Sequence, residues 1–315
     1  MEFNYSVLDD TEKIIYALRS LYMSRGYRLY RMGKFEEYDL YGRNKDFLVS
    51  DTVITFMDTN GRLMALRPDV TLSIIKNNRD LPKKLQKLCY NEYVYRTGKG
   101  DNSFREIMQT GLECFGPVDC RCISEVLQLA LDSLRTVSCE NALLVSDLDI
   151  ISCFLNGITE DANIRASLLK AAGEKNIHAL YSVCAENGID VEGAVKLEKL
   201  LTLKGGLSAV LPVLEQLCCG TEAGDAFGEF SEVLAYFDGK PDAENIMIDF
   251  SVTGDMNYYN GIVFKGYIPG VPENVLSGGQ YDRLMAKMGR KSKAVGFAVY
   301  LDLLERISIE STEED

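Results

Sequence analysis

The chain has 315 residues, of which 46% are hydrophobic and 26% charged, so it can form two domains or one large domain with an insertion. Its formal net charge of −13 at pH 7 argues against an extended nucleic-acid surface, because phosphate contacts need clustered Lys and Arg side chains. No apolar run reaches the length that spans a bilayer, and the acidic N-terminus lacks the apolar segment of a secretory signal. We therefore expect a cytoplasmic protein that does not bind membranes.

Cysteine and histidine usage limits the metal chemistry that the chain can support. Its nine cysteines, an odd number, indicate free thiols in a reducing compartment. The pairs Cys120/Cys122 and Cys218/Cys219 have no second pair at zinc-ligand spacing, and His178 is the only histidine. We therefore expect no metal site, no serine–histidine triad and no cofactor.

The first predicted element is a helix that ends at Gly26, with Asp10 or Thr11 as its N-cap. Its apolar side chains recur at helical spacing: Ile14, Ile15, Leu18 and Leu21. A β-hairpin follows, because Val53, Thr55 and Met57 alternate with their neighbours, and the turn sequence DTNG leads into RLMAL.

A second helix is predicted after Pro68, with Thr71 near its start. The strongest basic cluster, Leu81–Lys87, is interpreted as a solvated helix face. Two strands then flank the loop Gly98–Ser103, and a helix is predicted from Val118 to Val137.

The rest of the chain alternates between strands and helices. Residues 141–150 predict a short strand, and residues 152–237 are amphipathic helices with glycine breaks, a helical insertion subdomain. Strands return in ENIMIDFSV, YYNGIVFKGYI and AVGFAVYL. We therefore predict an α+β fold, with an antiparallel sheet flanked by helices, built from residues 1–151 and 238–315.

Polar side chains on the predicted strands mark a candidate site. Gln109 and Glu113 are four residues apart on one strand, so they point to the same face, and burying both is costly unless they are paired. Taken singly, each polar residue has a structural explanation: a salt bridge for Arg67, an internal hydrogen bond for Gln109, a nearby arginine for Glu113. Strand alternation predicts that only one of Tyr258 and Tyr259 faces the same pocket.

Four segments, in order, resemble those of histidyl-tRNA synthetases: TFMDTNGRLMALRPDVT, YRTGKGDNSFREIMQTGLECFG, NYYNGIVF, and SGGQYDRLMAKMG with AVGFAVYLDLL. They include class II motifs 2 and 3 and two histidine-specific segments. The resemblance covers roughly residues 8–150 and 245–305. It implies the core of a class II aminoacyl-tRNA synthetase, which is usually dimeric.

The resemblance also implies which residues bind histidine: Asp69, Thr71, Gln109, Glu113, Tyr259, Gly278 and Gly279. In the family, the first three positions hold the α-amino group, Glu113 stands where a carboxylate meets the imidazole, and the glycine pair lets the backbone approach the ligand. Tyr259 is the pocket tyrosine, which leaves Tyr258 facing away. Arg96, Arg105 and Tyr258 are further candidates for the pocket.

The sequence departs from the synthetases at positions that serve adenylation. Gly254 and Leu303 stand where the family has arginines, Gly98 replaces a motif 2 glutamate, and Gly33 falls near the motif 1 proline, whereas Arg96 is retained. Phosphoryl chemistry needs preorganised cations, so we expect no catalytic residue here. The chain given ends soon after motif 3, and we expect no anticodon-binding domain and no tRNA binding.

A chain that keeps the histidine pocket but lacks the adenylation residues resembles the regulatory subunits of ATP phosphoribosyltransferase. The segment IRASLLKAAGEKNIHAL also resembles the helical region of these subunits, more weakly. The resemblance implies a non-catalytic subunit that is required for the first step of histidine biosynthesis and mediates feedback inhibition by L-histidine. It implies homodimers within a hetero-oligomer, a hetero-octamer, with a separate short-form catalytic subunit. The alternatives are a histidine-activating synthetase-like enzyme or fragment, and a scaffold with a vestigial pocket.

Overall fold

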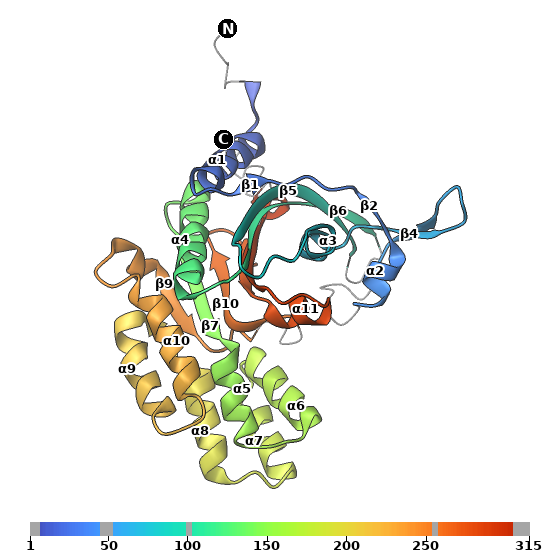
Figure 1. Cartoon of the computed structure of the whole chain (residues 1–315). Coiled ribbons are helices and arrows are strands. Elements are labelled where there is room, and N and C mark those ends of the chain that lie inside the picture. The colour runs from blue at the N-terminus through green and yellow to red at the C-terminus, as the bar shows by residue number, and fades with distance from the viewer. Residues whose placement is uncertain (1–6, 45–52, 99–102, 254–257, 305–315) are drawn as a thin grey trace.

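The computed structural model describes residues 7–44, 53–98, 103–253 and 258–304 (Figure 1). A large mixed sheet of nine strands forms its centre, in the order β1-β5-β6-β12-β11-β10-β7-β9-β8. The bounds of these strands are β1 Arg28–Leu29, β5 Gln86–Thr97, β6 Phe104–Gly116, β7 Ala142–Asp147, β8 Lys204–Gly206, β9 Ile246–Asp249, β10 Asn260–Tyr267, β11 Leu276–Gln280 and β12 Lys293–Tyr300.

The class of fold predicted from the sequence is confirmed, with one refinement of the strand directions. The central strands β5, β6, β12, β11, β10 and β7 pair antiparallel, whereas β1 with β5 and β7 with β9 are parallel pairs. A parallel pair needs a long connection, and the whole helical segment provides it between β7 and β9.

A smaller sheet of three strands has the order β2-β4-β3 and contains the predicted hairpin (Figure 1). Its strands are β2 Phe35–Glu37, β3 Thr55–Met57 and β4 Leu63–Leu66. The hairpin turn is closed by the Asp58 carboxylate, which accepts hydrogen bonds from the backbone N–H groups of Asn60 and Arg62. The turn sequence DTNG therefore places β3 beside β4 as expected.

Helices cover both faces of the large sheet and build two apolar cores. One core lies between the sheet and α1 and α4 and extends into the helical segment, and the other lies between the sheet and α2, α3 and α11 (Figure 1). The helices are α1 Asp10–Ser24, α2 Tyr38–Gly42, α3 Val70–Asn77, α4 Cys120–Val137, α5 Leu148–Asn156, α6 Ala162–Gly173, α7 Ile177–Glu186, α8 Val191–Thr202, α9 Leu207–Cys218, α10 Gly224–Ala235 and α11 Asp282–Lys287.

The segment predicted as a helical insertion contains α6 to α10 and continues from α5, and these helices gather beside one end of the sheet (Figure 1). It also contributes β8, a strand that the sequence did not predict. β8 pairs antiparallel with β9, so the helical segment is joined to the large sheet by backbone hydrogen bonds. The domain boundaries at residues 151/152 and 237/238 stay a prediction.

Two local predictions were wrong. The N-cap of α1 is Asp9 rather than Asp10 or Thr11, because Asp9 and Glu12 form a reciprocal capping box. Leu81–Lys87 is a turn that runs into β5 rather than a helix. Lys87 in this segment forms an ion pair with Glu125 of α4 at 2.7 Å.

Within the described ranges, no helix is long and apolar enough to cross a membrane. The same residues contain no group of three or more His, Cys, Asp or Glu side chains arranged as metal ligands.

Candidate functional site

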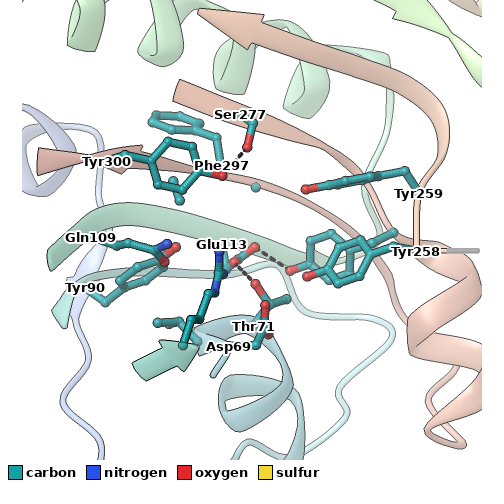
Figure 2. A pocket seen from close by; sticks show the side chains of 15 residues that line it. Asp69, Thr71, Tyr90, Gln109, Glu113, Tyr258, Tyr259, Ser277, Phe297 and Tyr300 are labelled. Carbon is teal, nitrogen blue, oxygen red and sulfur yellow. Dashed lines mark hydrogen bonds between the residues drawn. The ribbon is translucent and has the colours of Figure 1, made fainter. Parts of the chain in front are cut away.

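A pocket opens on the face of the large sheet that α3 covers (Figure 2). Its walls come from the start of α3, from β5, β6, β11 and β12, and from the segments before β10 and α11. The lining residues are Asp69, Val70, Thr71, Tyr90, Arg96, Gln109, Glu113, Tyr258, Tyr259, Ser277, Tyr281, Gly296, Phe297, Ala298 and Tyr300. Residues from distant parts of the chain thus meet at one place.

Glu113 on β6 carries the most buried carboxyl group of the pocket, with 2% of its surface exposed. Its Oε1 accepts a hydrogen bond from the Thr71 hydroxyl at 2.7 Å, and its Oε2 accepts one from the Tyr281 hydroxyl at 2.6 Å (Figure 2). Burial raises the pKa of the Glu113 carboxyl to about 8, more than these two hydroxyls lower it. The partners of Glu113 are therefore hydroxyl groups, and the expectation that a nearby arginine pairs with it was wrong.

The prediction that Gln109 and Glu113 share one face of β6 is confirmed, since both are buried and line the pocket. The expected salt bridge of Arg67 is also confirmed, because its guanidinium lies 2.9 Å from the Glu92 carboxylate. Arg67 is completely buried and lies outside the pocket lining, so its role is structural.

Asp69 and Arg96 place side chains of opposite charge at the N-terminus of α3. The Asp69 carboxylate caps α3 by accepting the backbone N–H of Leu72 at 2.8 Å. Burial raises the pKa of Asp69, while the Leu72 N–H and the Arg96 guanidinium oppose that rise. Arg96 donates from Nε to the Pro68 carbonyl at 3.2 Å and lines the pocket, whereas Arg105 is exposed on β6 outside the lining. Arg105 therefore does not line this pocket, and its contribution to ligand binding stays a prediction.

Tyr258 and Tyr259 both line the pocket, with ring centroids 4.6 Å apart (Figure 2). The expectation that Tyr258 faces away was wrong. Strand alternation does not apply to this pair, because β10 begins only at Asn260. Tyr258 is 6% exposed, and Tyr259 is partly buried.

Gly278 and Gly279 lie on β11 but are absent from the pocket lining. A Cβ on Gly278 would meet the Gly296 carbonyl oxygen at 2.3 Å, and one on Gly279 would meet the Tyr259 ring at 2.9 Å. These glycines therefore make room for neighbouring protein atoms, and their predicted role in letting the backbone approach the ligand stays a prediction.

Gly296 on β12 is a pocket residue that the sequence did not reveal. It lies opposite Glu113 in the β6–β12 pairing, and a Cβ there would lie 1.9 Å from Glu113 Oε2. The buried carboxyl occupies the space that any other side chain at position 296 would need. A glycine inside a strand pattern was the available signal, since it often marks such a close approach.

Seven further lining residues were also missed: Val70, Tyr90, Ser277, Tyr281, Phe297, Ala298 and Tyr300. Tyr281 follows directly after β11 and reaches Glu113 across 168 positions of sequence. With Tyr258 and Tyr259, these residues give the pocket a largely aromatic wall (Figure 2).

The structure describes only some of the positions at which this chain lacks the adenylation residues of the synthetases. Gly254 lies outside the described residues. Leu303, which follows β12, is partly buried and packs against the larger apolar core rather than lining the pocket. The Gly98 N–H donates to the Ser103 carbonyl at the base of the loop between β5 and β6.

The pocket combines two carboxyl groups, an amide, several hydroxyls and one guanidinium with an aromatic wall. Such a set can satisfy an ammonium group, a carboxylate and a polar ring of a single small ligand. A mostly antiparallel sheet with this site on one face defines a class II synthetase-like protein with a polar and aromatic pocket.

Comparisons with known proteins agree with this class. The family model described as histidyl-tRNA synthetase matches residues 6–304. An ATP phosphoribosyltransferase regulatory subunit from Clostridium kluyveri is 30% identical over 298 residues, which cover 90% of this chain and 74% of the relative. A protein of the same name from Bacillus cereus is 27% identical, over 96% of this chain and 73% of its own length.

Solved structures that resemble this chain belong to the same group of proteins. A Bacillus halodurans protein described as an ATP phosphoribosyltransferase regulatory subunit/histidyl-tRNA synthetase superposes with a TM-score of 0.81 at 26% identity, covering 93% of this chain and 78% of that one. An ATP phosphoribosyltransferase complex from Thermotoga maritima gives a TM-score of 0.72 at 17% identity, covering 93% and 97%, which supports the fold alone. The chain belongs to the histidyl-tRNA synthetase family, among its ATP phosphoribosyltransferase regulatory subunits.

Proposed function

We propose that the chain is the non-catalytic regulatory subunit of an ATP phosphoribosyltransferase and that histidine is the effector that its pocket binds. The observation that carries the proposal is the Glu113 carboxyl, buried at the end of an aromatic pocket in a chain that belongs to this family. Glu113 would hold the imidazole of histidine, and Asp69 with Gln109 would hold its ammonium group.

The proposed partner is a separate short-form catalytic subunit, which would carry the first step of histidine biosynthesis. Within that cytoplasmic assembly the chain would form homodimers inside a hetero-octamer and would not bind tRNA. Histidine would inhibit by binding one quaternary state more tightly than the other, so that the coupling free energy between pocket and partner shifts the assembly.

Reconstitution with a short-form catalytic subunit tests this proposal. The mixture should synthesise phosphoribosyl-ATP faster than the catalytic subunit alone, and added histidine should suppress that activity. Separate Glu113→Ala and Tyr259→Ala variants should still activate but lose the response to histidine. We expect an affinity loss of roughly 10- to 100-fold for Glu113→Ala, because a charge-assisted hydrogen bond disappears.

Circular dichroism and thermal melting of both variants provide the control for folding. If both folded variants keep the inhibition curve of the unchanged protein, the pocket assignment is wrong. An Arg105→Ala variant is the matched control, because Arg105 is exposed outside the pocket lining and its loss should leave histidine inhibition unchanged.

The alternative of a histidine-activating synthetase is favoured by the retained Arg96 at the pocket. Histidine-dependent ATP–pyrophosphate exchange by the purified chain distinguishes the two proposals. Turnover would contradict a non-catalytic subunit, whereas binding of histidine without exchange agrees with it.

A further inference from the structure

Among the residues that the structure describes, the buried Glu113 carboxyl has no cationic partner. Each of its oxygens accepts one hydroxyl, and no ion pair in the described ranges includes it. The titratable groups around it are Asp69 beside α3, Tyr90 and Arg96 on β5, Tyr258 and Tyr259 before β10, Tyr281 before α11, and Tyr300 on β12. Of these groups, the Asp69 carboxylate raises the pKa of Glu113 further. The Arg96 guanidinium instead lowers the pKa of Asp69.

This environment keeps a proton on Glu113 when the pocket is empty at neutral pH. Burial raises the pKa of its carboxyl to about 8, and Gly296 leaves room for the group, since a Cβ there would lie 1.9 Å from Glu113 Oε2. The aromatic rings of the wall present electron-rich faces, which favour a cation inside the pocket. A cationic ligand would therefore supply the partner that the buried carboxyl lacks.

We propose that the pocket binds the histidine side chain as an imidazolium, with the ring proton donated by Glu113. The proposal rests on the proposed function, because it assumes that histidine is the ligand. The O–H bond of the Glu113 carboxyl breaks, an N–H bond forms on the ring, and a carboxylate–imidazolium pair remains. The pocket and ligand together keep the same number of protons, so no other reactant is needed.

This proton transfer selects ligands by the basicity of their ring. An imidazole has an ordinary pKa of about 6.5 and can accept the proton, whereas a ring of similar shape but much lower basicity cannot. The analogue 1,2,4-triazole-3-alanine has the size of histidine and a far less basic ring. It should therefore bind at least about tenfold more weakly than histidine. Each unit by which the ring pKa is lower makes the proton transfer about tenfold less favourable.

The numbers of protons bound by the free pocket, the free ligand and the complex also predict how histidine affinity depends on pH. Between about pH 6.5 and 8, free histidine is neutral and the empty pocket is protonated, so binding exchanges no proton with the solvent. Below this window Glu113 must release a proton, and above it the complex must take one up. Histidine affinity should fall up to tenfold per pH unit on both sides, and the only alkaline decrease left in Glu113→Gln should be the one from the ligand's α-amino group.

Nitrogen NMR of the full-length protein with ring-¹⁵N histidine at pH 8 tests the proposal directly. Free histidine at that pH is almost entirely neutral, so its two ring nitrogens differ widely in chemical shift. We expect the bound ring to show the two closely spaced shifts of an imidazolium. Widely separated shifts in the bound state would overturn the proposal while leaving histidine binding intact.

Calorimetry with histidine and with the triazole analogue provides the second measurement. Equal affinities for the two ligands would also overturn the proposal. Failure of histidine to bind at all, by either method, would instead refute the proposed function. The histidine/analogue affinity ratio cancels titration of the α-amino group, which both ligands share.

Discussion

Arg67 and Glu113 are both buried ionisable side chains close to the same pocket, but their surroundings differ. Arg67 donates three hydrogen bonds to protein acceptors: the carbonyls of Gly33 and Tyr93 and the carboxylate of Glu92. Glu113 receives two hydroxyls and faces a cavity. A buried charge that the protein pairs by itself is structural, whereas one with neutral partners beside a cavity is available to a ligand.

Replacing Arg67 should have the largest effect on stability. Arg67→Ala leaves the Glu92 carboxylate and two carbonyls without their partner, so unfolding should become easier by about 3–5 kcal/mol. Urea denaturation measures the change. Arg62→Ala is the control, because the ion pairs of Arg62 with Glu37 and Asp58 are exposed and should contribute less than about 1 kcal/mol. Equal losses in the two variants would show that the buried contacts of Arg67 stabilise the fold no more than a surface ion pair does.

The pH dependence of stability should sharpen the same contrast through Glu113. Its folded pKa of about 8 lies above the unfolded value near 4.5, so the folded state binds its proton more tightly. This contribution to stability is complete below about pH 4.5 and is lost as pH rises to 8. Glu113→Gln should therefore gain stability relative to the unchanged protein over that interval, by up to several kcal/mol. A constant difference between urea midpoints at pH 5 and pH 8 would show that Glu113 titrates normally.

The smallest expected effect concerns Gly296, the residue that makes room for Glu113. Gly296→Ala places a Cβ 1.9 Å from Glu113 Oε2 and 2.5 Å from the Leu112 carbonyl oxygen, so the strands must shift. We expect a loss of about 1–3 kcal/mol and weaker histidine binding. Gly228→Ala on α10 is the matched control, since a Cβ there meets no atom within 4 Å and should stabilise the helix by up to about 1 kcal/mol. A neutral Gly296→Ala variant would mean that the carboxyl can move aside.

Much of the fold follows from local sequence patterns. Alternation along 86–116 identified two long strands, and the same period placed Gln109 and Glu113 on one face. The DTNG turn identified the β3–β4 hairpin, and Pro68 with Thr71 located the start of α3. These features depend on residues close in sequence, where backbone periodicity and turn chemistry are sufficient.

Other features of the site depend on how distant strands align. Strand alternation could not predict that Tyr258 faces the pocket. Tyr258 and Tyr259 precede β10, and residues outside a strand do not alternate between two faces. The parallel pairing of β7 with β9 and the added strand β8 likewise depend on the path of the helical segment.

By itself, the sequence determined many elements of the fold, the family and the face of β6 on which the site lies. Only the tertiary structure decided what surrounds Glu113. Tyr281 and Gly296 reach it through the alignment of β6 with β12 and the turn after β11, contacts between residues far apart in the chain. The protonation of Glu113 follows from that burial, since removal from water is a property of the assembled sheet and helices rather than of any segment.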